Sequence, residues 1–379
     1  MSRKRSIFEE VQDGQRSGPV AAAVGSIDRV RGSRGAVQAW LITLGVLVVA
    51  MIVIGGLTRL TDSGLSITNW RPLSGAIPPL NAADWQLEFD AYRASPQYIH
   101  MNAGMSLEEF KFIFWWEWGH RQLGRIVGLV WAIGFVALWV TKKIPAGWVP
   151  RMIWVGVLGG LQGAIGWWMV SSGLEGERTS VASYRLATHL GLAFLILGYI
   201  FWYVLLLGRS EAELMKARRA GEQKLFGMTT GLMHLTMAQI LLGALVAGID
   251  AGRGYTDWPL MAGGVFPPGM WDLTPVWRNF FENDGTVQFI HRLVGYLLFA
   301  FAVVVTLRGR RSPHAATRSA YTLAGALVFL QMVMGVVTVM HSSPLHIAIF
   351  HQIGAILVFA AVLRARFLAR FPIERSLRA

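Results

Sequence analysis

The sequence contains no cysteine and few charged residues. Asp, Glu, Lys and Arg make up 15% of its 379 residues, against roughly 25% in an ordinary soluble domain. Without thiols the chain cannot form disulfides, use a cysteine nucleophile or build a metal site from thiolates. Any metal must therefore be held by His or by carboxylates. Because 54% of the residues are hydrophobic, the composition indicates a membrane protein.

Eight apolar runs are each long enough to cross the roughly 30 Å hydrocarbon core of a bilayer. An even number of spans places both termini on the same side. We therefore predict an all-α polytopic membrane protein with eight transmembrane helices. The runs lie near residues 38–57, 119–140, 152–170, 186–207, 228–249, 288–307, 319–340 and 346–365.

The charges are divided unequally between the two sets of loops. The chain's two ends and the segments 141–151, 208–227 and 308–318 hold 24 of the 35 Lys and Arg but 8 of the 22 acidic residues. The opposite loops hold 8 basic and 14 acidic residues, and the other three Arg lie within the second and sixth spans, with Arg364 counted in the C-terminal end. The positive-inside rule then places both termini in the cytoplasm and the long loops 58–118 and 250–287 outside. The net charge of +13 is thus explained by topology, and we predict no nucleic-acid partner.

Both ends of the chain are predicted to be tails outside the membrane. Residues 1–37 lack the apolar region of a cleaved signal peptide, and we predict a disordered cytoplasmic tail there. Glu9, Glu10 and Asp13 are unusual in a mitochondrial transit peptide, which favours a bacterial inner membrane. Residues 366–379 are predicted to form a basic cytoplasmic tail.

Several motifs occur twice, once in each half of the chain. The halves, residues 38–207 and 228–365, are predicted to be tandem four-helix bundles joined by a cytoplasmic linker, 208–227. With four spans each, they would share one orientation and be related by a pseudo-twofold axis along the membrane normal. The matched pairs are Asp62 to Trp70 with Asp250 to Trp258, Pro78-Pro79 with Pro267-Pro268, His120-Arg121 with His291-Arg292, Gln162 with Gln331, and His189 with His351.

The repeated histidines are the candidate site. Each lies a few residues into a helix that enters from the outside, so all four are expected at similar depth. A helical bundle that presents one His from each of two facing helices can hold a haem iron between two axial nitrogens, and two His per half indicate two such sites. The alternative is that they only form interhelical hydrogen bonds. The four are His120, His189, His291 and His351.

The other five histidines lack this pattern. His234 has no histidine at the matching place in the first half, and we interpret it as a packed core residue. His100 and His314 are predicted to be solvated in loops. His341 and His346 bracket a short outer turn and could reach a haem propionate or serve as alternative ligands.

Charged residues accompany the second-span and sixth-span histidines. Glu117 precedes His120 by three residues, whereas the matching position in the second half is Gln288. An i, i+3 offset places both groups on one helix face, and a carboxylate there can take up a proton or stabilise positive charge. The alternative is a charged residue at a helix start that the helix dipole favours.

Three arginines follow the same histidines. Guanidinium groups suit haem propionates through charge-assisted hydrogen bonds, and snorkelling to lipid headgroups is an equal alternative. They are Arg121, Arg125 and Arg292.

These motifs resemble the haem A synthase family. The similarity rests on Glu117-Trp-Gly-His120-Arg121-Gln-Leu-Gly-Arg125, on the run Gly-Gly-Leu-Thr-Arg-Leu-Thr-Asp-Ser-Gly-Leu-Ser at 55–66, and on the second His-Arg pair. It covers about residues 38–365. The long first outer loop is similar to the proteobacterial and mitochondrial branch. Some members of the family carry a cysteine pair in their outer loops. This chain has no cysteine, so the resemblance implies no thiol-dependent step here.

The resemblance implies an oxidoreductase that converts the C8 methyl of haem O to a formyl group, making haem A for terminal oxidases. It implies that His291 and His351 ligate a haem b, that His120 and His189 face the substrate haem iron, and that Glu117 is catalytic. It also implies oxidation through an alcohol and a hydrated aldehyde.

The partners, the oligomeric state and the choice between alternative functions stay open at this point. A haem O synthase, cytochrome oxidase assembly factors and lipid are the implied partners, and a homo-oligomer is left open. One alternative function is a dihaem b-type electron-transfer protein. Another is a haem or small-molecule permease.

Overall fold

The computed structural model describes residues 21–174 and 176–373, and this part of the chain is helical without a β-strand. Eight of its helices are long and apolar enough to cross a membrane, as predicted. The chain is therefore a multi-pass membrane protein. The eight are α1 (Ala21–Leu60), α4 (Leu107–Val140), α5 (Val149–Leu174), α6 (Ser183–Leu207), α8 (Gln223–Gly248), α10 (Asp284–Gly309), α11 (Ala315–Met340) and α12 (Leu345–Arg370).

The second membrane helix begins earlier than the apolar run predicts. We expected it near residue 119, but α4 starts at Leu107, where Ser106 and Glu109 form a capping box. Charged residues in the first turns hide this start from a search for apolar runs. The burial of Phe110, Ile113 and Phe114 shows the helical spacing that continues into the span.

The helices of each half pack in the same order. In the first half, α1 contacts α4 and α6, and α5 contacts the same two helices. In the second half, α8 contacts α10 and α12, and α11 contacts the same two. Each half is therefore a closed ring of four helices, and the second and fourth helices of each ring carry the repeated histidines.

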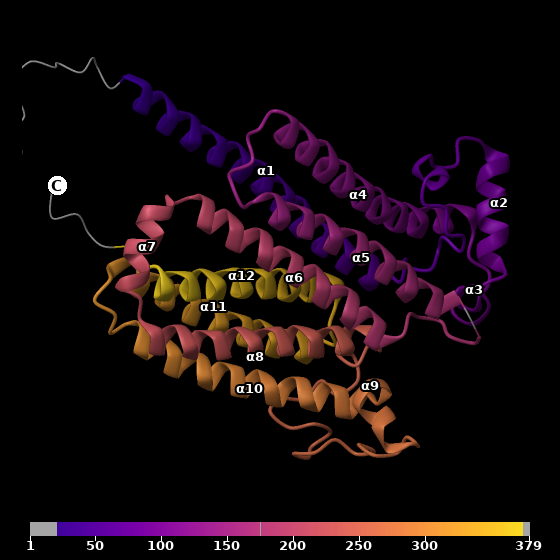
Figure 1. The fold of residues 1–379 in the computed structure, drawn as a ribbon. Helices are drawn as coiled ribbons and strands as arrows, with labels where there is room; N and C mark the ends of the chain where they lie inside the picture. Colours follow the sequence, from indigo (N-terminus) through magenta and orange to yellow (C-terminus); the bar gives the residue numbers. More distant parts are fainter. Residues whose placement is uncertain (1–20, 175, 374–379) are drawn as a thin grey trace, which may run out of the picture.

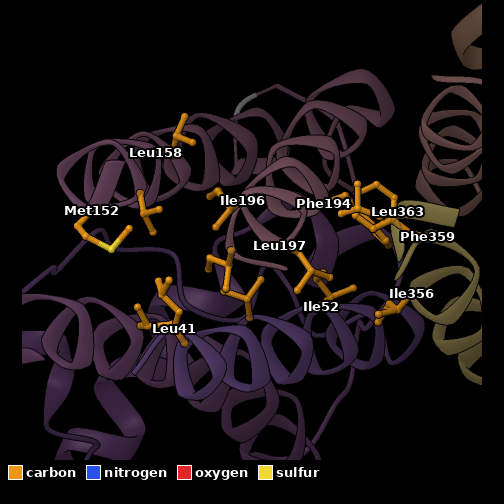
Figure 2. Close-up of a cluster of buried hydrophobic side chains, with 14 of the residues drawn as sticks. Leu41, Ile52, Met152, Leu158, Phe194, Ile196, Leu197, Ile356, Phe359 and Leu363 are labelled. Carbon is orange, nitrogen blue, oxygen red and sulfur yellow. The ribbon is translucent and has the colours of Figure 1, made fainter. Parts of the chain in front are cut away.

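The two rings are joined by a continuous apolar interface. α6 packs against α8 and α12, and α1 packs against α12. Figure 2 shows side chains from α1, α5, α6 and α12 in one cluster. Within it, the rings of Phe194 and Phe359 meet edge to face with centroids 5.3 Å apart. Gln352 Nε2 also donates to the carbonyl of Ile52 at 2.6 Å, so the halves form one packed body.

The connecting segments separate to opposite ends of the bundle (Figure 1). At one end lie the short elements of the two long loops, and at the other lies α7 (Glu211–Arg219) in the linker. This is the arrangement that alternating spans require. The loop elements are η1 (Ser74–Ala76), α2 (Ala82–Arg93), α3 (Pro96–His100), η2 (Val276–Arg278) and α9 (Asn279–Glu282).

The repeated Asp residues adopt the same conformation in both halves. Asp62 and Asp250 follow α1 and α8 with φ of 52° and 56°, in the left-handed region that Asp enters more readily than most residues. Arg59 binds both carboxylates, at 2.8 Å to Asp62 and 2.7 Å to Asp250. This arginine therefore links the two halves at the loop-bearing end.

The predicted tails lie only partly within the described structure. Residues 1–20 and 374–379 are outside it. Residues 21–37, which we expected in the N-terminal tail, belong to α1, and residues 366–370 form the last turn of α12. The helical content therefore extends further into both tails than the apolar runs indicate.

Candidate functional site

A cavity between the two rings brings all four repeated histidines to one place. Its volume is about 370 Å³, and its lining includes the four imidazoles and apolar side chains of both halves. His120 lies within electrostatic reach of His189, and His291 within reach of His351. The two histidines of each half thus lie near one another at the cavity.

Each of the four rings packs against a glycine of the preceding span. A Cβ atom on Gly166 would lie 2.9 Å from His189 Cε1, and one on Gly335 would lie 3.0 Å from His351 Cε1. A Cβ on Gly243 would lie 3.2 Å from His291 Cε1. The remaining pair is His120 with Gly55, where the distance is 3.1 Å to Nε2. A methyl group at any of the four positions would press on an imidazole, most closely at Gly166, because the rings fill the space of a side chain.

Three of these histidines also carry a glutamine partner. Gln162 Nε2 lies 3.2 Å from His189 Nδ1 and donates to the His189 carbonyl at 3.0 Å. The same two contacts join Gln239 to His291, at 3.1 and 3.0 Å, and Gln331 to His351, at 3.2 and 2.8 Å. Sequence reasoning matched Gln162 with Gln331 but missed Gln239. Its repeat counterpart is Met51, on the helix whose Gly55 packs against His120, so no repeated glutamine marks the position.

Glu117 is buried, with 2% of its surface exposed, and its carboxylate is fully bonded. One oxygen accepts from Ser66 Oγ and Ile67 N, both at 2.8 Å, and the other accepts from Arg121 Nη2 at 2.6 Å. It lies eleven residues into α4, so it is not a residue of the first helical turn. Glu117 is absent from the lining of the 370 Å³ cavity.

Gln288 occupies the matching place in the second half. Its Oε1 accepts from Arg292 Nη2 at 3.0 Å, and its Nε2 donates to the Ala251 carbonyl at 2.7 Å. Glu117 and Gln288 therefore make equivalent contacts. Each bonds the arginine four residues later, and each joins its own membrane helix to the loop that follows the first span of the same half. Gln288 lines the cavity.

The three predicted arginines hold backbone carbonyls of the outer loops. Arg121 donates to Ile67 O and Arg125 to Pro72 O, both at 2.9 Å. Arg121 and Arg125 line a separate surface pocket of about 230 Å³. Arg292 donates to three loop carbonyls and lines the histidine cavity, where Arg59 and Arg253 also lie. Sequence reasoning missed these last two because they belong to loops or helix ends without a neighbouring histidine.

The remaining histidines lie apart from the cavity lining. His234 is exposed on the outer side of α8, so the prediction of a packed core residue is wrong. The sequence cannot show which side of a largely apolar helix faces the neighbouring helices. His100 is exposed as predicted, and His314 is half-buried at the start of α11. His341 and His346 are exposed at the outer turn.

The donor set fits haem better than a bare metal ion. Within residues 21–174 and 176–373, no three His, Asp or Glu side chains gather in a way that could hold an ion. Two paired imidazoles per half, with apolar walls, are instead the ligand chemistry of a bis-histidine haem. The buried Oε1 atoms of Gln162 and Gln239 find no partner among the described residues. Fold and site define a polytopic membrane protein with paired histidines beside a largely apolar cavity.

The chain belongs to the COX15-CtaA family of cytochrome oxidase assembly proteins, which it matches over residues 38–363. Among its relatives are proteins named haem A synthase from three bacteria. The Ruegeria pomeroyi protein is 63% identical over 381 residues, covering 100% of both chains. The Ruegeria sp. TM1040 protein is 61% identical, covering 99% of both. The Paracoccus denitrificans protein is 60% identical over 99% of this chain and 98% of its own.

Proposed function

We propose that this chain is a haem A synthase, an oxidoreductase that converts haem O to haem A for cytochrome oxidase assembly. The observation that carries the proposal is the gathering of four half-buried histidines, two from each half, beside one membrane cavity. The full-length similarity to proteins named haem A synthase supports it.

The histidine pairs are assigned different roles. His291 and His351 hold a haem b, which supplies one-electron redox chemistry when bound. His120 and His189 face the iron of the substrate haem O. The reaction changes the C8 methyl of that substrate to a formyl group. The apolar walls exclude water from the macrocycle, and the outward-facing apolar surface lets a lipid-soluble isoprenoid tail lie between helices.

Glu117 is assigned to the substrate methyl as an acid–base or charge-stabilising group. Its burial, its place three residues before His120 and its amide counterpart Gln288 support the assignment. To reach a substrate it must give up one of its bonds to Arg121, Ser66 or the Ile67 amide. An amide at this position keeps the bond to the arginine but can neither hold a proton nor carry charge.

The arginines are assigned to the haem propionates at the loop-bearing end. Arg292 lines the cavity, and Arg59 and Arg253 line it at the same end, where both form ion pairs with Asp250. Arg121 and Arg125 border the neighbouring pocket and would exchange loop carbonyls for carboxylates. Charge-assisted bonds to carboxylates are stronger than bonds to neutral carbonyls, so this exchange is favourable.

The membrane arrangement completes the proposal. The halves 38–207 and 228–365 are related by a pseudo-twofold axis along the membrane normal, which the identical helix order in the two rings supports. The first half holds substrate and the second holds haem b. The protein lies in the bacterial inner membrane with both termini and the 208–227 linker in the cytoplasm, which the charge distribution supports. A haem O synthase and oxidase assembly factors are its expected partners.

Replacement of a second-half ligand tests the assignment of roles. His291→Ala should remove the haem b bands from the reduced visible spectrum of the purified protein, because one axial nitrogen is lost. His234→Ala is the matched control, since His234 is exposed and outside the cavity lining. Unchanged haem b bands in His291→Ala would show that this histidine is not a ligand.

A further inference from the structure

We propose that Gln162, Gln239 and Gln331 are positioning residues that clamp axial imidazoles, and that Met51 leaves His120 without a clamp. His120 is then the ligand that lets go when substrate enters and product leaves. The inference rests on the proposed function and deepens it, because it names the residue that makes one haem exchangeable.

A common spacing underlies the clamps. In three spans a glutamine precedes the histidine-facing glycine by four residues, as Gln162-Gly166, Gln239-Gly243 and Gln331-Gly335. Residues at i and i+4 lie on the same face of a helix, one turn apart. The glycine therefore admits the ring and the glutamine reaches it from the next turn. In α1 the corresponding pair is Met51-Gly55.

The glutamine amide lies over the ring rather than in its plane. Gln162 Nε2 is 3.2 Å from His189 Nδ1 and 3.3 Å from Nε2. Gln239 Nε2 is 3.1 and 3.4 Å from the same two atoms of His291. An atom nearly equidistant from both ring nitrogens would overlap the ring atoms between them if it lay in the plane. The in-plane lone pairs therefore stay open for a metal.

A second bond fixes the amide itself. Each of the three glutamines also donates to the backbone carbonyl of the histidine that it covers. Two contacts to one residue restrict rotation of the imidazole about its side-chain bonds. Contacts of this kind around a metal ligand fix its orientation.

His120 lacks this support, and its ring is turned differently. Met51 has no amide to donate. The atom of His120 nearest Gly55 is Nε2, whereas at the other three histidines Cε1 lies nearest the glycine. The amide clamp and the common ring orientation are therefore absent at the same histidine. A loosely held ligand suits a haem that must enter and leave, and clamped ligands suit one that stays.

Restoring the missing glutamine tests the proposal. Met51→Gln should slow the loss of haem O and haem A from the first half, and Met51→Leu, which adds no amide, should not. The measurement is the rate of haem transfer from purified protein to excess apomyoglobin, followed by visible spectra and haem extraction. Because outer contacts change metal affinity by about 10- to 100-fold, we expect a slowing of at least about tenfold. The haem b bands report that each variant is folded.

The reciprocal change keeps the test informative if Met51→Gln fails to assemble. Gln239→Leu should release haem b at least about tenfold faster and shift the electron paramagnetic resonance of the oxidised haem, which reports the relative orientation of the axial imidazoles. Wild-type release rates and spectra in Met51→Gln, or in Gln239→Leu where the first variant cannot be made, would overturn the clamp. The proposed function fails separately, if the wild-type protein makes no haem A from haem O.

Discussion

Gly166→Ala should weaken substrate binding through a single methyl group. A Cβ at this position would lie 2.9 Å from His189 Cε1, whereas ordinary van der Waals contact begins at 3.4 Å. The imidazole must retreat by about 0.5 Å, the difference between these values. Overpacking of this kind costs about 1–3 kcal/mol, and each 1.4 kcal/mol is a factor of about ten in an equilibrium constant. The expected loss of haem affinity in the first half is therefore about 5- to 140-fold.

Gly163→Ala is the matched control, because it lies on the same helix and a Cβ there meets no atom within 4 Å. Both variants gain the same helix propensity, about 1 kcal/mol, so a difference between them reports the histidine contact. The assay is the ratio of extracted haem O plus haem A to haem b in each purified protein. Equal ratios in Gly166→Ala and Gly163→Ala would refute the packing argument.

Two further changes separate chemistry from structure. Glu117→Gln should lower haem A formation by about 100- to 10,000-fold, the usual contribution of a general acid or base, while haem b and haem O stay bound. Haem A formation at the wild-type rate would show that Glu117, like Gln288, only bonds the neighbouring arginine and the loop. The backbone amides of Gly263 and Ala262 lower the pKa of Asp257 below 3.8, so its stabilisation of the 257–264 loop should be complete above the unfolded pKa and disappear as the pH falls through the folded value. The hydrogen-exchange protection factors of this loop should fall there in the wild type but not in Asp257→Asn, and equal pH profiles of the two proteins would contradict the carboxylate's role.

The sequence predicts most of the fold and the four histidines that gather at the cavity. Apolar length is sufficient to find eight spans, because a lipid-exposed helix must be apolar over its whole crossing. Repetition identifies the four histidines of the cavity, since two copies of a histidine pair stand out against unmatched histidines such as His234. The start of α4 is missed because its first turns are charged. Helix orientation is missed where one span is apolar on all sides.

The supporting contacts are harder to predict. Gln239 escapes detection because its repeat partner is Met51, and only the packed structure shows that it touches His291. The bonds from Arg121 and Arg292 to loop carbonyls depend on how the long outer loops fold back. No local sequence pattern predicts how these loops fold back onto the membrane helices. Residue type and spacing are therefore sufficient to find the histidines of the cavity, whereas the contacts that support them depend on tertiary packing.

The most direct test is mass analysis of the haems extracted from the purified protein after expression with a supply of haem O, together with its reduced visible spectrum. The account predicts haem b together with haem O, its hydroxylated form or haem A. Two haems b with no modified haem would contradict the synthase function and favour an electron-transfer protein. The absence of any haem would show that the four histidines serve helix packing and do not bind haem.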